Sequence, residues 1–222
     1  MKPSLIFDYD GTIHDTIRIY EPSLRKVLSW LEEQYEVPIP PVNRERIASW
    51  MGMNRREMWE SFLPQLPFEV REQAGAMVGK NIGVQIREHK AAWYPGIRET
   101  LDILKNEGYR MAVLSNCQNA YARSHWEEFG MERWFTAFYD CESYDYAPKT
   151  EIIRQLEQVL PKPDLVIGDR KKDLECARSS GSRFIGCLYG FGTEQELKEA
   201  DALADRPEDL AELIRTQAEH SR

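Results

Sequence analysis

The sequence predicts an α/β protein in which a doubly wound parallel sheet carries a helical domain as an insertion. From residue 93 onward, short apolar runs alternate with amphipathic helix patterns, which is typical of parallel strands covered by helices on both faces. An apolar run at residues 5–7 predicts an earlier strand, whereas residues 14–92 carry helix patterns and no convincing strand. We therefore predict a core domain at 1–13 and 93–222 and a helical domain at 14–92.

The first predicted strand, Leu5-Ile6-Phe7, is followed at once by Asp8, Asp10 and Gly11. On an extended backbone the two carboxylates would point to the same side. Like charges held so close raise one pKa unless a cation or phosphate-binding donors offset them. One carboxylate then suits nucleophilic attack on a substrate, and the other suits proton transfer. The alternative is a strand end with a solvated Asp-Gly turn.

The composition restricts the class of protein. The 222 residues, 42% of them hydrophobic, suffice for one good core and a smaller inserted domain. A net charge of -8 argues against non-specific binding to nucleic acid or to anionic membranes. The four cysteines show no Cys-x-x-Cys spacing, and the sequence has neither a signal peptide nor a long apolar run. We expect a soluble cytoplasmic protein with reduced, buried thiols.

The inserted stretch predicts a small helical domain. Apolar residues recur at helical spacing at 24, 27, 28 and 31, and Pro22 lies near the expected start of that helix, where its missing N–H costs nothing. The Pro38-Ile39-Pro40-Pro41 run ends the helix. Further helices are predicted around residues 47–51, 58–62 and 70–78.

After residue 93 the pattern alternates. Strands are predicted at 111–114, 137–139, 165–167 and 184–188. Helices are predicted at 97–104, 119–129, 149–159, 173–179 and 210–214. Gly108 and Gly130 are typical helix-ending glycines.

Polar residues close three of the predicted strands. Asp8 with Asp10, Ser115 with Asn116, and Asp169 follow strands that should all end at one edge of the sheet. Ligands bind outside the carboxyl ends of the strands in such sheets. These residues therefore predict a functional site.

A metal ion and a lysine are expected at this edge. Asp169 and Asp173, four apart at a predicted helix start, should share one helical face. Four converging carboxylates need compensation, and hard oxygen ligands suit Mg²⁺. We prefer Lys149 as the nearby positive charge, because its rival Lys162 enters a strand at the opposite end of the sheet.

Taken together, these residues carry a family resemblance. Asp8-x-Asp10-Gly11-Thr12, Ser115 after an apolar strand, Lys149, and Gly168-Asp169-x-x-x-Asp173 resemble the four ordered motifs of the haloacid dehalogenase superfamily of phosphohydrolases. The helical insertion between the first two motifs is similar to the cap of its phosphoglycolate-phosphatase-like branch. The resemblance covers almost the whole chain. It implies a Rossmann-like core sheet in the order 5-4-1-2-3, dependence on Mg²⁺, and an aspartyl-phosphate intermediate.

The resemblance also implies residue roles. Asp8 is expected to be the nucleophile and Asp10 the general acid and base. The expected phosphate-binding residues are Gly11, Thr12, Ser115, Asn116 and Lys149. The expected metal site comprises Asp8, the backbone carbonyl of Asp10, Asp169 and Asp173.

Some positions depart from the family pattern. The phosphate-binding lysine is usually followed by proline in this branch, whereas Thr150 follows Lys149 and Pro148 precedes it. The basic run at 170–172 replaces a more typical Ser/Asn-containing turn, and we interpret it as a solvated rim. We interpret His14 as a solvated or hydrogen-bonded loop residue and not as a catalytic one.

The predicted function is a Mg²⁺-dependent phosphatase for a small phosphorylated metabolite, phosphoglycolate-like or a sugar phosphate. A phosphosugar mutase of the same superfamily is the closest alternative, and a phospho-receiver domain or a non-catalytic binding protein is a more distant one. Asp10 disfavours a carbon–halogen substrate, because dehalogenases of this fold lack an acid there. The sequence gives no signal of oligomeric state.

The helical domain is expected to act as a lid that reads the substrate. The Gly52-Met53-Asn54 break between two helices predicts an exposed loop. We expect Met53, Arg55 or Arg56 to face the leaving group, and the alternative for the arginines is a solvated helix start.

Overall fold

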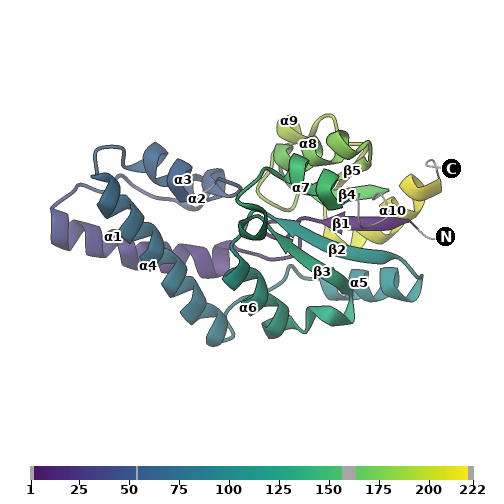
Figure 1. Ribbon diagram of the computed structural model, residues 1–222, viewed down its shortest axis with the longest axis horizontal. Helices are drawn as coiled ribbons and strands as arrows, with labels where there is room; N and C mark the ends of the chain where they lie inside the picture. Colours follow the sequence, from purple (N-terminus) through teal and green to yellow (C-terminus); the bar gives the residue numbers. More distant parts are fainter. Residues whose placement is uncertain (1–2, 54, 157–163, 220–222) are drawn as a thin grey trace. The chain divides into compact units, whose positions relative to one another are not determined.

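The computed structural model describes residues 3–53, 55–156 and 164–219 (Figure 1). The chain divides into two compact units, one formed by Met1–Asp15 with Trp93–Arg222 and the other by Thr16–Ala92. None of the helices that the structure describes is both long enough and apolar enough to cross a membrane.

The first unit is built on a six-stranded sheet whose neighbouring strands are all parallel. In spatial order the strands are β3 (Phe135–Asp140), β2 (Arg110–Ser115), β1 (Ser4–Phe7), β4 (Leu165–Gly168), β5 (Arg183–Cys187) and β6 (Ala202–Ala204). Figure 1 labels the first five of these. The predicted order 5-4-1-2-3 is confirmed for the first five strands. The sixth strand was missed, because three residues reading Ala-Leu-Ala give no strand pattern.

Helices separate the strands along the chain. They are α5 (Ile97–Asn106), α6 (Asn119–Phe129), α7 (Lys149–Leu156), α8 (Lys171–Ser180), α9 (Glu194–Leu197) and α10 (Leu210–Glu219). Short 3₁₀ turns lie at η1 (Met131–Arg133), η2 (Glu142–Tyr144) and η3 (Pro207–Asp209). The α/β class is thus confirmed.

Apolar side chains fill both faces of this sheet. Leu5 and Phe7 of β1 pack in one cluster with residues of α5 and α10, whereas Ile6 between them packs in a second cluster with residues of α7 and α8. Successive residues of a strand point to opposite faces. The near-continuous apolar strands are therefore buried on both sides, as the doubly wound arrangement requires.

The register brings the carboxyl ends of the central strands together. Phe7 pairs with Val113 of β2 on one side and with Ile167 of β4 on the other. The residues that follow these positions, Asp8, Ser115 and Asp169, therefore come to the same edge of the sheet.

Two details of the predicted helices are wrong or lie outside the described residues. Helix α8 begins at Lys171, so Asp169 precedes it and does not share a helical face with Asp173. Helix α7 is described only to Leu156, and the predicted continuation to Val159, together with Lys162, lies outside the described residues.

The second unit consists of α1 (Ile17–Tyr35), α2 (Arg44–Trp50), α3 (Arg55–Phe62) and α4 (Phe68–Arg87), and it contains no strand among its described residues. Helix α1 packs against α4. It starts earlier than predicted because Ile17 and Ile19 are buried, which places Pro22 inside the helix and not at its start. The missing N–H of Pro22 therefore removes one intrahelical hydrogen bond.

None of the four cysteines forms a disulfide within the part of the chain that the structure describes. Cys141, Cys176 and Cys187 are buried, and Cys117 is half-buried.

Candidate active site

A buried group of three carboxylates lies at the carboxyl edge of the sheet. Asp8 follows β1, Asp169 follows β4, and Asp173 stands in the first turn of α8. One carboxylate oxygen from each lies within 4.8 Å of the others. All three side chains are buried. The structure thus brings together three of the four aspartates that the sequence predicted.

Lys149, the first residue of α7, joins this group. Its Nζ donates hydrogen bonds to Oδ1 of Asp8 and, at 2.6 Å, to Oδ1 of Asp173. Burial lowers the pKa of the Lys149 ammonium, but the charges of Asp173 and Asp8 outweigh burial and raise that pKa above its ordinary value. The lysine is therefore a fixed positive charge between two carboxylates.

One ammonium does not neutralise three buried carboxylates. Burial raises the pKa of Asp8 against the opposing charge of Lys149. Burial also raises the pKa of Asp169, and the charges of Asp8 and Asp173 raise it further. Repulsion and burial therefore disfavour the charged carboxylates, and a bound cation would favour them.

The donor atoms fit a divalent cation. Oδ2 of Asp169 accepts a hydrogen bond from the backbone N–H of Phe191 at 2.7 Å. Its Oδ1 is buried and has no hydrogen-bond partner among the described residues. A buried carboxylate oxygen without a partner is costly. Together with the neighbouring carboxylates it offers the hard oxygen ligands that Mg²⁺ and similar ions take.

The Asp10 carboxylate lies outside this acidic group and is held by other partners. Its Oδ1 accepts a hydrogen bond from the Tyr121 hydroxyl at 2.6 Å and lies 3.2 Å from Nδ1 of His14. The Asp10 side chain is 25% exposed, whereas His14 is fully buried. The expectation of a solvated His14 is thus wrong, and the expectation of a hydrogen-bonded one is correct.

The remaining predicted phosphate-binding residues lie on the same edge or next to it. Ser115 ends β2 and is buried, and the following Asn116 is exposed. The Thr12 hydroxyl is buried and has no hydrogen-bond partner among the described residues. Gly11 has a φ of 92°, and a Cβ there would collide with the carboxylate of Asp169. Glycine is therefore required at position 11 on two independent grounds.

The loop after β5 supports the site and was missed. Gly190 lies so close to Gly11 and Asp169 that a Cβ would collide with both, and Gly192 lies closer still to the Asp169 carbonyl oxygen. The Tyr189 hydroxyl donates a hydrogen bond to the Thr12 carbonyl at 2.9 Å. Two glycines just beyond a strand end were the available signal, because such glycines permit close backbone approach.

The three predicted specificity residues belong to the second unit. Arg55 forms an ion pair with Glu72 at 2.6 Å, and its side chain lies over Gly75. The Arg56 guanidinium lies 5.3 Å from the Phe68 ring centroid. Met53 is exposed, and the adjacent Asn54 lies outside the described residues.

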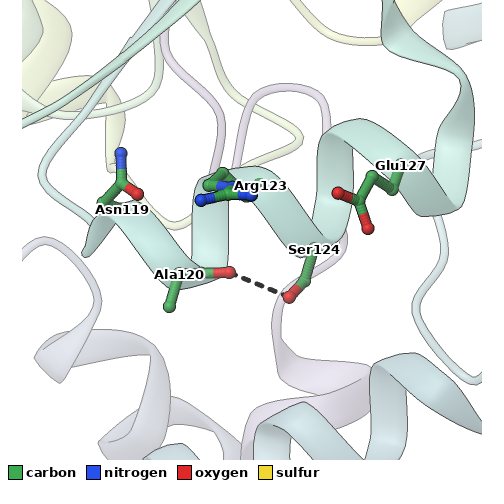
Figure 2. A pocket seen from close by; sticks show the side chains of 5 residues that line it. All are labelled: Asn119, Ala120, Arg123, Ser124 and Glu127. Atoms are coloured by element: carbon green, nitrogen blue, oxygen red, sulfur yellow. Dashed lines mark hydrogen bonds between the residues drawn. The ribbon is translucent and has the colours of Figure 1, made fainter.

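A surface hollow lies along α6, and its lining includes none of Asp8, Asp169 and Asp173. Figure 2 shows its five lining side chains, all from this one helix, with the Ser124 hydroxyl bonded to the Ala120 carbonyl at 2.8 Å. The lining residues are Asn119, Ala120, Arg123, Ser124 and Glu127. We assign it no part in the site.

The fold and the site together define an α/β enzyme with a carboxylate–lysine centre at the carboxyl edge of a parallel sheet. The chain belongs to the haloacid dehalogenase-like hydrolase family, whose pattern it matches over residues 5–187. The predicted family is thereby confirmed.

Relatives with assigned names agree with this membership. The chain is 24% identical to a phosphoglycolate phosphatase of Vibrio vulnificus, covering 95% of each chain. It is also 24% identical to a phosphorylated carbohydrates phosphatase of Thermotoga maritima, covering 96% of this chain and 98% of the relative. Its fold is similar to the crystal structure of a predicted phosphoglycolate phosphatase from Haemophilus somnus, with a TM-score of 0.78, 20% identity, and coverage of 96% and 97%. The predicted enzyme class, phosphoric monoester hydrolase, is confirmed.

Proposed function

We propose that this protein is a Mg²⁺-dependent phosphatase that hydrolyses a small phosphorylated metabolite through an aspartyl phosphate on Asp8. The observation that carries the proposal is the Lys149 ammonium bound to both Asp8 and Asp173 inside the buried acidic group. Such a centre places a carboxylate nucleophile beside fixed positive charge, and phosphoryl transfer depends on that combination.

The chemistry proceeds in two steps. An Asp8 oxygen attacks phosphorus, and the bond from phosphorus to the leaving oxygen breaks while that oxygen takes a proton from Asp10. The Asp10 carboxylate then removes a proton from water, whose oxygen attacks phosphorus and breaks the bond to Asp8. The same residue thus serves as acid and then as base.

Other residues hold the phosphate. Lys149 and the Ser115 hydroxyl neutralise and orient its oxygens, with the loop at Gly11 and Thr12 and the exposed Asn116 completing the site. Asp8, Asp169, Asp173 and the Asp10 backbone carbonyl would hold Mg²⁺. When bound, the ion supplies positive charge that stabilises the transferring phosphoryl group.

Metal removal and two aspartate variants test the metal site. Activity is expected to require Mg²⁺, and Asp169→Ala should weaken Mg²⁺ binding more than Asp173→Ala does, because Asp169 has a buried oxygen without a hydrogen bond whereas Asp173 is bound by Lys149. Asp173→Ala should instead lower thermal stability, since Asp173 also accepts the Arg170 N–H at the start of α8.

Calorimetric Mg²⁺ titration and thermal melts, run on both variants, separate these effects. Full activity of metal-free protein in excess chelator would end the proposal of a metal site. A reversed order of Mg²⁺ affinities would instead reassign the principal ligand to Asp173.

The substrate is proposed to be phosphoglycolate-like or a sugar phosphate. This rests on the phosphoglycolate phosphatase and the phosphorylated carbohydrates phosphatase to which the chain is similar. Phosphate release from a panel of phosphorylated metabolites tests it. A hexose 1-phosphate in the panel addresses the mutase alternative, because formation of an isomer without phosphate release favours a mutase.

The Thr16–Ala92 unit is proposed to act as the cap that excludes bulk water and reads the substrate. The two connections to this unit meet beside the first motif, where His14 pairs with Trp93 and the Ile13 carbonyl accepts the Tyr94 N–H at 2.9 Å. Exclusion of water strengthens the electrostatic contacts to phosphate. A cytoplasmic location is proposed with this function.

A triple alanine variant tests whether the cap reads the substrate. Alanine at Met53, Arg55 and Arg56 together should raise KM and change the ranking of phosphorylated substrates, because these residues are proposed to contact the leaving group. Hydrolysis of acetyl phosphate, which offers little to contact, should change little. Glu72→Ala is the matched control, since it releases Arg55 from its ion pair and leaves the loop residues in place. An unchanged ranking in the triple variant would assign specificity to another part of the cap.

A further inference from the structure

Two polar groups, one from Tyr121 and one from His14, meet at one oxygen of Asp10. The Tyr121 hydroxyl lies 2.6 Å from Oδ1, His14 Nδ1 lies 3.2 Å from the same oxygen, and the hydroxyl and Nδ1 are themselves 3.2 Å apart. A phenol is protonated at neutral pH, so Tyr121 donates to the carboxylate. Tyr121 lies on α6, far from Asp10 in sequence, so this contact is made only in the folded chain.

A buried hydrogen-bond network of Trp93, Tyr9 and His125 packs against Tyr121 and His14. Trp93 Nε1 donates to the Tyr9 hydroxyl at 3.2 Å, so the Tyr9 proton is directed to His125 Nδ1 at 2.7 Å. Burial and the neighbouring His14 lower the pKa of His125 to about 2. His125 is therefore neutral and can accept at Nδ1. The hydrogen bonds thus run in one direction, from Trp93 to Tyr9 and from Tyr9 to His125.

This hydrogen-bond network fixes the rings of Tyr121 and His14, which contact Asp10. The His125 ring lies 4.2 Å from the Tyr121 ring, one turn earlier on α6, and the Tyr9 ring stacks on His14 at 5.3 Å with 12° between the planes. Tyr9 and His125 are fully buried. Dense packing leaves their partners few alternative positions. The Tyr121 hydroxyl and the His14 imidazole are thus presented at fixed points.

We propose that Tyr121, supported by the buried Tyr9–His125 pair, is a positioning residue that holds the Asp10 carboxyl by Oδ1 so that Oδ2 transfers the proton. This inference rests on the proposed function, in which Asp10 is the acid and base. The side chain of Asp10 is partly exposed and lies outside the acidic group, so that group does not orient it. Tyr121 supplies the orientation, and misplacement by about 1 Å can cost about 10²-fold in rate.

Loss of this hydrogen bond should affect substrates unequally. An alkyl phosphate needs a proton on its leaving oxygen in the first step, whereas acetyl phosphate releases acetate without one. The ratio kcat/KM reports events up to and including the first irreversible step, which is phosphoryl transfer to Asp8. A misplaced Asp10 should therefore lower kcat/KM for an alkyl phosphate and leave kcat/KM for acetyl phosphate nearly unchanged.

The test compares Tyr121→Phe with Tyr139→Phe, a control that removes a hydroxyl from the same unit on β3. For Tyr121→Phe we expect kcat/KM for a primary alkyl phosphate to fall about 10- to 100-fold with KM little changed. For acetyl phosphate we expect less than about a 3-fold change in kcat/KM and a lower kcat, because water attack on the aspartyl phosphate also uses Asp10. The control should behave as the parent does.

A burst measurement makes the test independent of folding yield. Rapid mixing with acetyl phosphate should release about one acetate per active Tyr121→Phe molecule before the slow steady state, which counts the active sites. Equal losses of kcat/KM for both substrates after this correction, or no loss for either, would overturn the positioning role. If the parent protein hydrolyses no phosphate monoester, the proposed function fails instead, so the two failures are distinct.

Discussion

Asp8→Asn is expected to abolish steady-state phosphatase activity, with kcat lower by about 10⁴–10⁶-fold. An amide is a poor nucleophile and cannot form the acyl phosphate. The substitution preserves shape, and Lys149 keeps its 2.6 Å contact with Asp173. Steady-state phosphate release with the preferred substrate measures the effect.

Folding is the control for this variant. Circular dichroism and a thermal melt should show a folded protein, and phosphate or a substrate analogue should still bind. Substantial turnover by folded Asp8→Asn would remove Asp8 from the role of nucleophile.

Lys149→Met is expected to lower both stability and activity. It removes the ammonium from two buried carboxylates, and leaving a buried charge without its partner costs about 3–5 kcal/mol. The rate of phosphoryl transfer should also fall by about 10²–10³-fold, because a charge that neutralises phosphate is lost. Denaturant unfolding in chelator gives the first quantity, and single-turnover kinetics with Mg²⁺ give the second.

The stability loss should depend on pH. Burial already raises the pKa of Asp8, and loss of the Lys149 charge raises it further. The folded variant then binds a proton more tightly than the unfolded chain does, so its stability rises as the pH falls. The difference from the parent should shrink as the pH falls towards about 7, where Asp8 of the parent itself takes up a proton, and should change little below that pH.

Lys162→Met provides the matched control, because Lys162 was the rival lysine in the sequence. It should retain the parent's activity and pH dependence. The reverse pattern, a silent Lys149→Met and an inactive Lys162→Met, would reassign the phosphate-binding lysine.

Position along the strands is what made the acidic group predictable. Asp8, Ser115 and Asp169 each follow an apolar run, and parallel pairing alone brings such ends to one edge. Lys149 was placed by the same topological reasoning, and the structure puts its ammonium between Asp8 and Asp173. Asp173 does lie in the acidic group, but the reasoning that placed it there was wrong, because it meets Asp169 from the first turn of α8 and not along a shared helical face.

The residues that position the site do so through tertiary contacts that local sequence patterns do not predict. Tyr121 reaches Asp10 only because α6 packs beside the loop at residues 9–14, and periodicity describes α6 as an ordinary amphipathic helix. His14 is buried by rings from α6 in addition to the Tyr9 ring close to it in sequence. The Gly190–Gly192 loop likewise acquires its role from its proximity to Gly11 and Asp169.

Direct detection of phosphorylated Asp8 tests the central claim most sharply. Asp10→Asn should slow hydrolysis of the acyl phosphate by about 10²–10⁴-fold while still accepting a phosphoryl group from acetyl phosphate, which needs no acid. Acid quenching followed by peptide mass spectrometry should then find close to one phosphoryl group per molecule, on Asp8. A burst of acetate from Asp10→Asn without phosphate on Asp8, or with phosphate on another residue, would contradict the account.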